Sequence, residues 1–144
     1  MKILLDSNIA LDVVLKREPF YSSAEKIIGL SQGGIGLFIS ASAITDIYYV
    51  VRKTTGSKET AIILIKDLLE NIDVAAVTGN EIRQAISLDW GDFEDAVQYT
   101  AGETIAVDYI ITRNRSDFAS AVLPVVSPDE FLALLILPDK SEQR

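Results

Sequence analysis

The chain has 144 residues, of which 49% are hydrophobic, and a net charge of −8 at pH 7. This length and apolar content predict one folded domain with a sizeable core. Cysteine and histidine are both absent, which excludes disulfides, thiolate nucleophiles, the usual zinc sites and every serine–histidine triad. Catalysis would therefore have to use carboxylates, hydroxyls, lysine, arginine, tyrosine or a bound metal ion.

The acidic balance disfavours a protein that coats nucleic acid nonspecifically, because such proteins are usually basic. It is compatible with a nuclease whose carboxylates are neutralised locally by metal ions. No signal peptide precedes the first predicted strand, and no apolar run approaches the length of a membrane span. We therefore expect a soluble cytoplasmic protein.

The chain opens on a short apolar run, residues 3–5, which stops at Asp6 and is followed by helical spacing as far as Pro19. This pattern predicts a buried strand that delivers Asp6 to its carboxyl end, where ligands bind in open parallel sheets. Asp6 could instead be a polar turn residue that only caps the following helix.

The rest of the chain repeats this alternation. After the first strand and helix, strands are predicted at 35–39, 73–77, 107–112 and 122–126, and helices at 22–31, 40–56, 57–72, 78–88, 92–104 and 127–138. Strands that alternate with helices predict a parallel sheet covered on both faces. We expect a three-layer α/β/α fold with four to five parallel strands, a single domain over residues 1–138 and a polar tail over 139–144.

Other acidic residues also stand at strand ends or helix starts. Asp46 follows the second strand among apolar neighbours, where an acid is costly without a partner. Asp92 and Asp95 share a face of the first turn of their helix, although Asp92 could simply cap the helix and Asp95 could be favoured by its dipole. Asp117 follows the fourth strand, where it could also be an ordinary turn residue.

The carboxyl ends of parallel strands lie on one edge of a sheet, so Asp6 and Asp95 could meet around one cleft. Either Asn114 or Asp117 could complete it. Acids in a small space raise one another's pKa or recruit a cation, and oxygen ligands without histidine or cysteine favour Mg²⁺ or Mn²⁺. Such ions coordinate phosphate oxygens and activate water. The chemistry indicated is hydrolysis of a phosphodiester.

Four blocks of the sequence resemble the PIN domain family. In family order they are ILLDSNIALD at 3–12, SAITDIYY at 42–49, DFEDAVQ at 92–98 and DYIITRNRSDF at 108–118. Any one block is weak, but four in order are specific, and the resemblance covers about 2–135. It implies a parallel sheet with helices on both sides, acids that hold one or two Mg²⁺ or Mn²⁺ ions, and cleavage of single-stranded or structured RNA. Small prokaryotic members resemble VapC-type toxins, which are usually dimers inhibited by an antitoxin.

The resemblance carries the family's acidic positions onto this chain. They fall on Asp6, on Asp46 where the family usually has glutamate, on Asp95 with Asp92 beside it, and on Asn114 or Asp117 one helical turn later. Asp46 is one methylene shorter than glutamate, and Asn114 is neutral. These two departures bear on metal count and turnover, and not on the fold.

Polar and basic residues near these acids are assigned supporting roles. Hydrogen-bond donors that would orient the carboxylates are Ser7, Asn8, Thr45 and Thr112. Arg113 and Arg115 are expected to contact RNA phosphates, with Arg52 and Lys53 further out, unless they are ordinary surface charges. With no histidine available, the base would be a metal-bound hydroxide.

We therefore expect a metal-dependent endoribonuclease that is the toxin of a type II toxin–antitoxin module, with RNA as its substrate, an antitoxin partner and a homodimeric state. Two alternatives remain. The chain could be a non-catalytic PIN module that binds RNA or protein, which the neutral Asn114 favours. It could also be an RNA-processing nuclease without an antitoxin.

Overall fold

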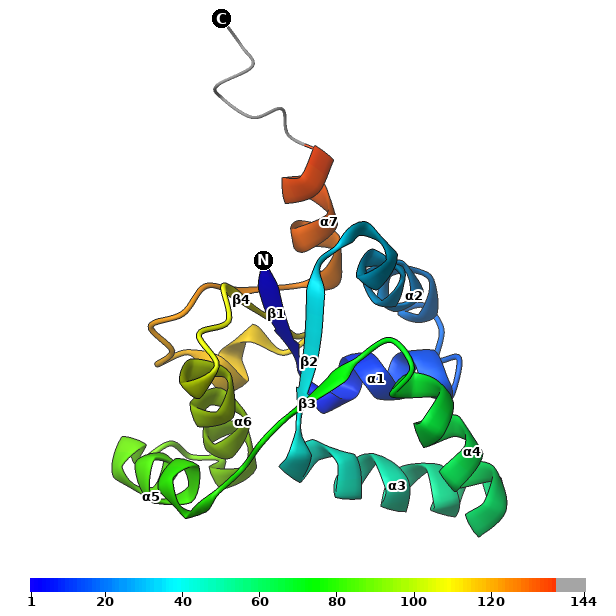
Figure 1. Cartoon of the computed structure of the whole chain (residues 1–144), viewed down its shortest axis with the longest axis horizontal. Coiled ribbons are helices and arrows are strands. Elements are labelled where there is room, and N and C mark those ends of the chain that lie inside the picture. The colour runs from blue at the N-terminus through cyan, green and yellow to red at the C-terminus, as the bar shows by residue number, and fades with distance from the viewer. Residues whose placement is uncertain (137–144) are drawn as a thin grey trace, which may run out of the picture.

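Five parallel strands form the centre of the fold, in the order β3-β2-β1-β4-β5 (Figure 1). The computed structural model describes residues 1–136, so the predicted domain end at Pro138 and the tail at 139–144 lie outside the described residues. The strands are β1 (Lys2–Leu5), β2 (Gly36–Ser40), β3 (Asp73–Ala75), β4 (Tyr109–Ile111) and β5 (Val125–Val126). The predicted parallel sheet is confirmed.

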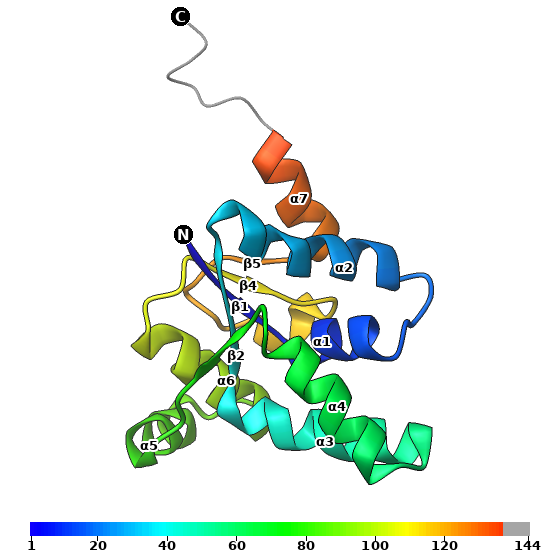
Figure 2. The ribbon, with the colours of Figure 1, turned by 45° about the vertical axis from the view of Figure 1, so that its right-hand side comes forward.

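Helices cover both faces of the sheet. They are α1 (Ser7–Val14), α2 (Tyr21–Gly29), α3 (Ala41–Thr55), α4 (Lys58–Leu68), α5 (Gly79–Leu88), α6 (Phe93–Thr104) and α7 (Pro128–Ile136), with short 3₁₀ turns η1 (Leu30–Gly33) and η2 (Arg115–Phe118). Figures 1 and 2 show α5 and α6 on one side of the sheet and α1, α2 and α4 on the other. The expected three-layer α/β/α fold is therefore confirmed.

Strand β1 lies in the middle of the sheet and is buried on both faces. Ile3 and Leu5 belong to a core shared with α1 to α4 and α7, whereas Leu4 belongs to the core beneath α6. This alternation follows from the two-residue period of a strand, and burial on both sides explains why the run is apolar without a polar interruption. In the sheet, Leu5 is level with Ile39 of β2 and Ile111 of β4.

Helix α6 approaches β1 closely at a glycine. A Cβ atom added to Gly102 would lie 3.0 Å from Leu4 Cδ2 and 3.2 Å from Val107 Cγ2. These distances are shorter than ordinary van der Waals contacts, so a side chain at this position would require Leu4, Val107 or α6 to shift. The close approach fixes which face of α6 meets the sheet.

The predicted helix starts at Ser57, Thr78 and Asp92 are confirmed, because each side chain accepts a hydrogen bond from a backbone N–H in the first turn of its helix. Element ends differ from the predictions. The helix predicted over 22–31 gives way to η1 after Gly29, and the strand predicted over 122–126 is shortened to two residues beyond Pro124, which has no N–H for the ladder. Within residues 1–136, no helix is both long and apolar enough to span a membrane.

Candidate active site

Asp6 follows β1 directly and is held by residues of the neighbouring strand. Its backbone N–H donates to the Ile111 carbonyl oxygen at 3.0 Å, Thr112 Oγ1 donates to its Oδ2 at 2.8 Å, and Ser7 Oγ donates to its Oδ1 at 3.3 Å. Asp6 stands at the N-cap position of α1 without a side-chain capping bond. Burial raises the pKa of Asp6, while the bonds from Thr112 and Ser7 oppose that rise. The carboxylate is therefore delivered to the edge of the sheet and does not act as a helix cap.

Asp95 brings a second carboxylate to the same place from α6. It is 9% exposed, and burial, followed by the charges of Asp92, Asp6 and Asp117, raises its pKa to about 7. Asp6, Asp95 and Asp117, which come from the end of β1, from α6 and from η2, are called the acidic cluster below. Asp92 lies at its margin and caps α6, accepting the Asp95 N–H at 3.0 Å. The capping interpretation is thus correct for Asp92 and does not describe Asp95.

Asp46 lies beside Glu94, a residue to which the sequence analysis gave no role. Burial raises the pKa of Glu94 to about 7, helped by a hydrogen bond with Asp46 and by the charges of Asp46, Asp92 and Asp95. The predicted need of Asp46 for a partner is therefore met by a second carboxyl group. The position of Glu94 next to Asp95 in the DFED block was the feature that pointed to it.

Asn114 and Asp117 occupy different places in the loop after β4. The backbone N–H of Asn114 donates to Thr112 Oγ1 at 3.0 Å, and its side chain is exposed. The negative charge of Asp117 helps to raise the pKa of both Asp6 and Asp95. Of the two residues, Asp117 is therefore the one that interacts with the other carboxylates of the acidic cluster.

The residues assigned to orient the carboxylates divide into two pairs. Ser7 and Thr112 contact Asp6, as their expected role requires. Thr45 Oγ1 instead donates to the Ser42 carbonyl oxygen within its own helix at 3.1 Å, and no side-chain hydrogen bond of Asn8 occurs among residues 1–136. Among the described residues, neither of these two side chains donates a hydrogen bond to a carboxylate of the site.

The acidic cluster has the chemistry of a site for a hard divalent ion. Its donors are all oxygen atoms. Burial and then the neighbouring negative charges raise the pKa of Asp95 to about 7, and a bound cation would oppose this rise. Over the part of the chain that the structure describes, no three acidic side chains lie close enough together to hold an ion. Binding one ion between all three carboxylates of the cluster would therefore require them to move closer together.

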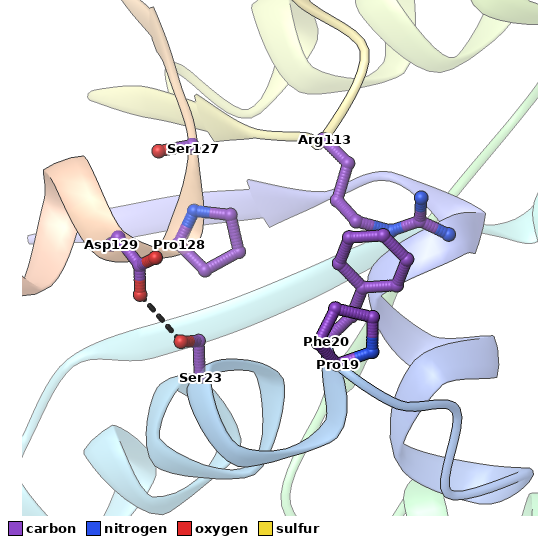
Figure 3. A pocket seen from close by; sticks show the side chains of 7 residues that line it. All are labelled: Pro19, Phe20, Ser23, Arg113, Ser127, Pro128 and Asp129. Carbon is purple, nitrogen blue, oxygen red and sulfur yellow. Dashed lines mark hydrogen bonds between the residues drawn. The ribbon is translucent and has the colours of Figure 1, made fainter.

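Arg113, two residues after the end of β4, lines a separate pocket (Figure 3). Its Nε and Nη2 donate to Asp12 at 2.7 and 3.1 Å, and its guanidinium lies 3.8 Å from the centre of the Phe20 ring. Asp12 is completely buried. A pocket of about 370 Å³ lies between this group and the start of α7. Figure 3 shows its lining residues, among which Ser23 donates a hydrogen bond to Asp129. Arg113 is thus fixed in place beside the residue that holds Asp6.

The other basic residues are more exposed. Arg115 Nη1 contacts both carboxylate oxygens of Glu130 at 3.2 and 3.1 Å, at the protein surface. Arg52 and Lys53 are exposed near the end of α3.

Asp12, the buried partner of Arg113, was not predicted from the sequence, although an acid within the apolar run of α1 was a sign of a buried pair.

A family model described as PIN domain matches residues 2–116. The chain belongs to the PIN domain family. Its fold is shared with a toxin–antitoxin complex from Klebsiella pneumoniae at 20% identity, over 88% of this chain and 97% of that one, with a TM-score of 0.66. VapBC-1 from nontypeable Haemophilus influenzae has 19% identity over 90% and 99%, with a TM-score of 0.66. VapC20 from Mycobacterium tuberculosis, a sarcin–ricin loop cleaving toxin, has 13% identity over 83% and 95%, with a TM-score of 0.67.

These structures show the fold of this PIN domain, and at such identities they show nothing further. No curated protein matches the chain. The resemblance to PIN domains seen in the four sequence blocks is confirmed by the family match and by these structures.

The raised pKa of Asp95 predicts how the stability of the metal-free PIN domain depends on pH. The pKa is 3.8 in the reference state and about 7 in the folded chain, so the folded state binds more protons between these values. The favourable contribution of Asp95 is fully present below pH 3.8 and is lost as the pH rises through about 7. In chelator, the free energy of unfolding measured with urea should fall across this window.

Asp95→Asn should reduce the slope of that dependence, because the amide does not titrate, whereas Glu94, whose pKa is also raised to about 7, still contributes. Asp67→Asn, which changes an exposed acid on α4, should leave it unchanged and serves as the control. Equal slopes for Asp95→Asn and the wild type would contradict the assignment.

Proposed function

We propose that this PIN domain is an endoribonuclease that hydrolyses RNA phosphodiester bonds with Mg²⁺ or Mn²⁺ held by the acidic cluster. The observation that carries the proposal is the convergence of Asp6, Asp95 and Asp117 from three separate elements, with the pKa of Asp95 raised to about 7. Membership of the PIN family and the toxins among the solved structures support nuclease activity.

Different residues of the chain would bind the ion, orient its ligands and hold the helix that carries them. Asp6 and Asp95 would bind it, and Thr112 and Ser7 would hold the Asp6 carboxylate in one orientation through the bonds that they already donate. Asp92 would keep the first turn of α6, and so Asp95, in place. The bound ion would supply a Lewis acid for the phosphoryl group and a lowered pKa for the attacking water.

Arg113 would contact a phosphate of the substrate. Its bonds to Asp12 use Nε and Nη2, which leaves Nη1 for a phosphate oxygen. Arg115 could exchange its exposed pair with Glu130 for a phosphate, because such surface pairs contribute only about 0–1 kcal/mol. Arg113, held by Asp12, and Arg115 would offset the overall negative charge of the chain near the site.

We further propose that the chain is the toxin of a toxin–antitoxin pair, binds an antitoxin and forms a homodimer. The complexes from Klebsiella pneumoniae and Haemophilus influenzae with the same fold support the antitoxin partner. The alternative of a non-catalytic module drew on the neutral Asn114. It is weakened by Asp117, whose carboxylate interacts with Asp6 and Asp95. An RNA-processing nuclease without antitoxin would share the same active site.

The proposed activity predicts that the purified protein cleaves a mixture of single-stranded and structured RNAs in Mg²⁺ or Mn²⁺. Excess chelator should abolish cleavage and added metal should restore it, because the site has no histidine to act as a base without the ion. Gel analysis of RNA checks this, and Asp95→Asn purified in parallel controls for contaminating nuclease. Cleavage that persists in chelator would refute the metal mechanism. No cleavage, together with no Mn²⁺ binding in calorimetry, would favour the non-catalytic module.

A further inference from the structure

Gln98 of α6 is buried without hydrogen bonds. Its side chain is 1% exposed, and it is the only one in residues 1–136 with buried polar atoms, Oε1 and Nε2, that lack a partner. An unpaired buried polar group costs about 1–3 kcal/mol, and native proteins pair nearly all such groups. Leucine or methionine would fill the same space without that cost, so the amide requires an explanation.

The position of Gln98 along α6 places it beside the acidic cluster. Asp95, Gln98 and Gly102 are spaced by three and four residues and share one face of the helix. Gly102 packs against Leu4, and Asp95 interacts with the charge of Asp6. Leu4 and Asp6 are two residues apart in extended chain and so point to the same side of the sheet. Gln98 therefore lies between these two contacts, on the face of α6 that is turned towards the sheet.

The neighbouring strands add buried polar residues at the same level. The register pairs Leu5 with Ile39 and with Ile111, so the next residues, Ser40 and Thr112, stand level with Asp6. Both are completely buried. Ser40, Asp6 and Thr112 thus form a polar row at the carboxyl ends of three strands, on the side that α6 covers. Gln98 is on the face of the helix that covers this polar row.

We propose that Gln98 is a positioning residue of the acidic cluster, whose carboxamide hydrogen-bonds to Asp95 and Asp6, directly or through a buried water, when they turn to hold the metal ion. This inference rests on the proposed function of the site. The same movement would account for two observations. No three acidic side chains among residues 1–136 are grouped closely enough to hold an ion, and the amide has no partner in that arrangement. Nε2 can donate to a carboxylate while Oε1 accepts from a bound water.

The test is Gln98→Met, which removes the amide and keeps the approximate volume. In chelator its melting temperature should equal or exceed that of the wild type, because no hydrogen bond is lost. Its Mn²⁺ affinity in calorimetry should fall about 10–100-fold, and kcat for RNA should fall with KM unchanged. A residue that only fills the core would change neither metal affinity nor kcat.

Thr100→Val is the matched control. Thr100 is also a buried polar residue of α6, but its hydroxyl donates to the Glu81 and Val97 carbonyl oxygens at 3.0 and 3.1 Å. This variant should lose stability and keep its Mn²⁺ affinity, the reverse of Gln98→Met.

Each other outcome is decisive. Wild-type metal affinity and kcat in Gln98→Met would overturn the inference and leave the proposed function standing. A Gln98→Met protein that is less stable than the wild type in chelator would show that the amide is already paired, and would overturn it too. A wild type that binds no Mn²⁺ would overturn the proposed function, and this inference with it.

Discussion

Asp6→Asn and Asp95→Asn are each expected to abolish metal-dependent RNA cleavage while the fold survives. Both substitutions keep the shape of the side chain and remove the charge that would hold the ion. A catalytic metal contributes several kcal/mol of transition-state stabilisation, and each 1.4 kcal/mol is about tenfold in rate, so the loss should reach about a thousandfold or more. Cleavage rates under saturating Mg²⁺ or Mn²⁺, with circular dichroism as a check of the fold, measure the effect.

Asp95→Asn should also differ from a simple loss-of-function change, because it is expected to raise the stability of the metal-free protein. Above pH 7, Asp95→Asn should unfold at a higher urea concentration than the wild type in chelator, because it removes a carboxylate that burial and neighbouring charges destabilise. Asp67→Asn on α4 should match the wild type in both cleavage and stability. If Asp95→Asn retained cleavage within about tenfold of the wild type, Asp95 could not be a metal ligand.

Arg113→Ala is expected to destabilise the fold more than any other single change of a charged residue considered above. It would leave the completely buried carboxylate of Asp12 without its partner, and breaking a buried ion pair from one side costs about 3–5 kcal/mol. The stacking of the guanidinium on Phe20, at 3.8 Å, would be lost as well. A domain of this size is stable by only about 5–15 kcal/mol, so urea unfolding should show a large shift of the midpoint.

Two further variants distinguish the stability lost by breaking the buried ion pair from the stability lost by removing a surface charge. Arg115→Ala breaks an exposed pair with Glu130 and should cost less than about 1 kcal/mol. Adding Asp12→Asn to Arg113→Ala removes the stranded charge and should recover part of the loss. If Arg113→Ala cost no more than Arg115→Ala, Asp12 would not be held by a desolvated ion pair.

The layout of the sheet and the position of Asp6 followed from local sequence patterns. An apolar run that stops at an acid and is followed by helical spacing predicts that Asp6 lies at the carboxyl end of a buried strand. This prediction uses local sequence alone. The parallel arrangement then brought Thr112 level with Asp6, and the hydrogen bond of 2.8 Å between them depends on that register. Capping residues marked the helix starts because their bonds lie within one turn.

Interactions that depend on how helices pack were not predictable in the same way. The buried pair of Asp12 and Arg113 joins residues 101 positions apart, and Glu94 meets Asp46 only because α3 and α6 pack at the same end of the sheet. The unpaired amide of Gln98 has no sequence pattern at all, since a glutamine on a helix is ordinarily a surface residue. Only Asp12, an acid within an apolar stretch, carried a clue of this kind, and in each case the partner or its absence was set by tertiary structure.

The metal site itself is tested most directly by a crystal structure of the wild-type protein with Mn²⁺, using anomalous diffraction to locate the ion. We expect an anomalous peak at the carboxyl end of β1, bound by Asp6 and Asp95, with Asp117 turned towards it and Asn114 outside its coordination sphere. Saturating Mn²⁺ with no peak between Asp6 and Asp95, while both side chains are ordered, would contradict the proposed nuclease site.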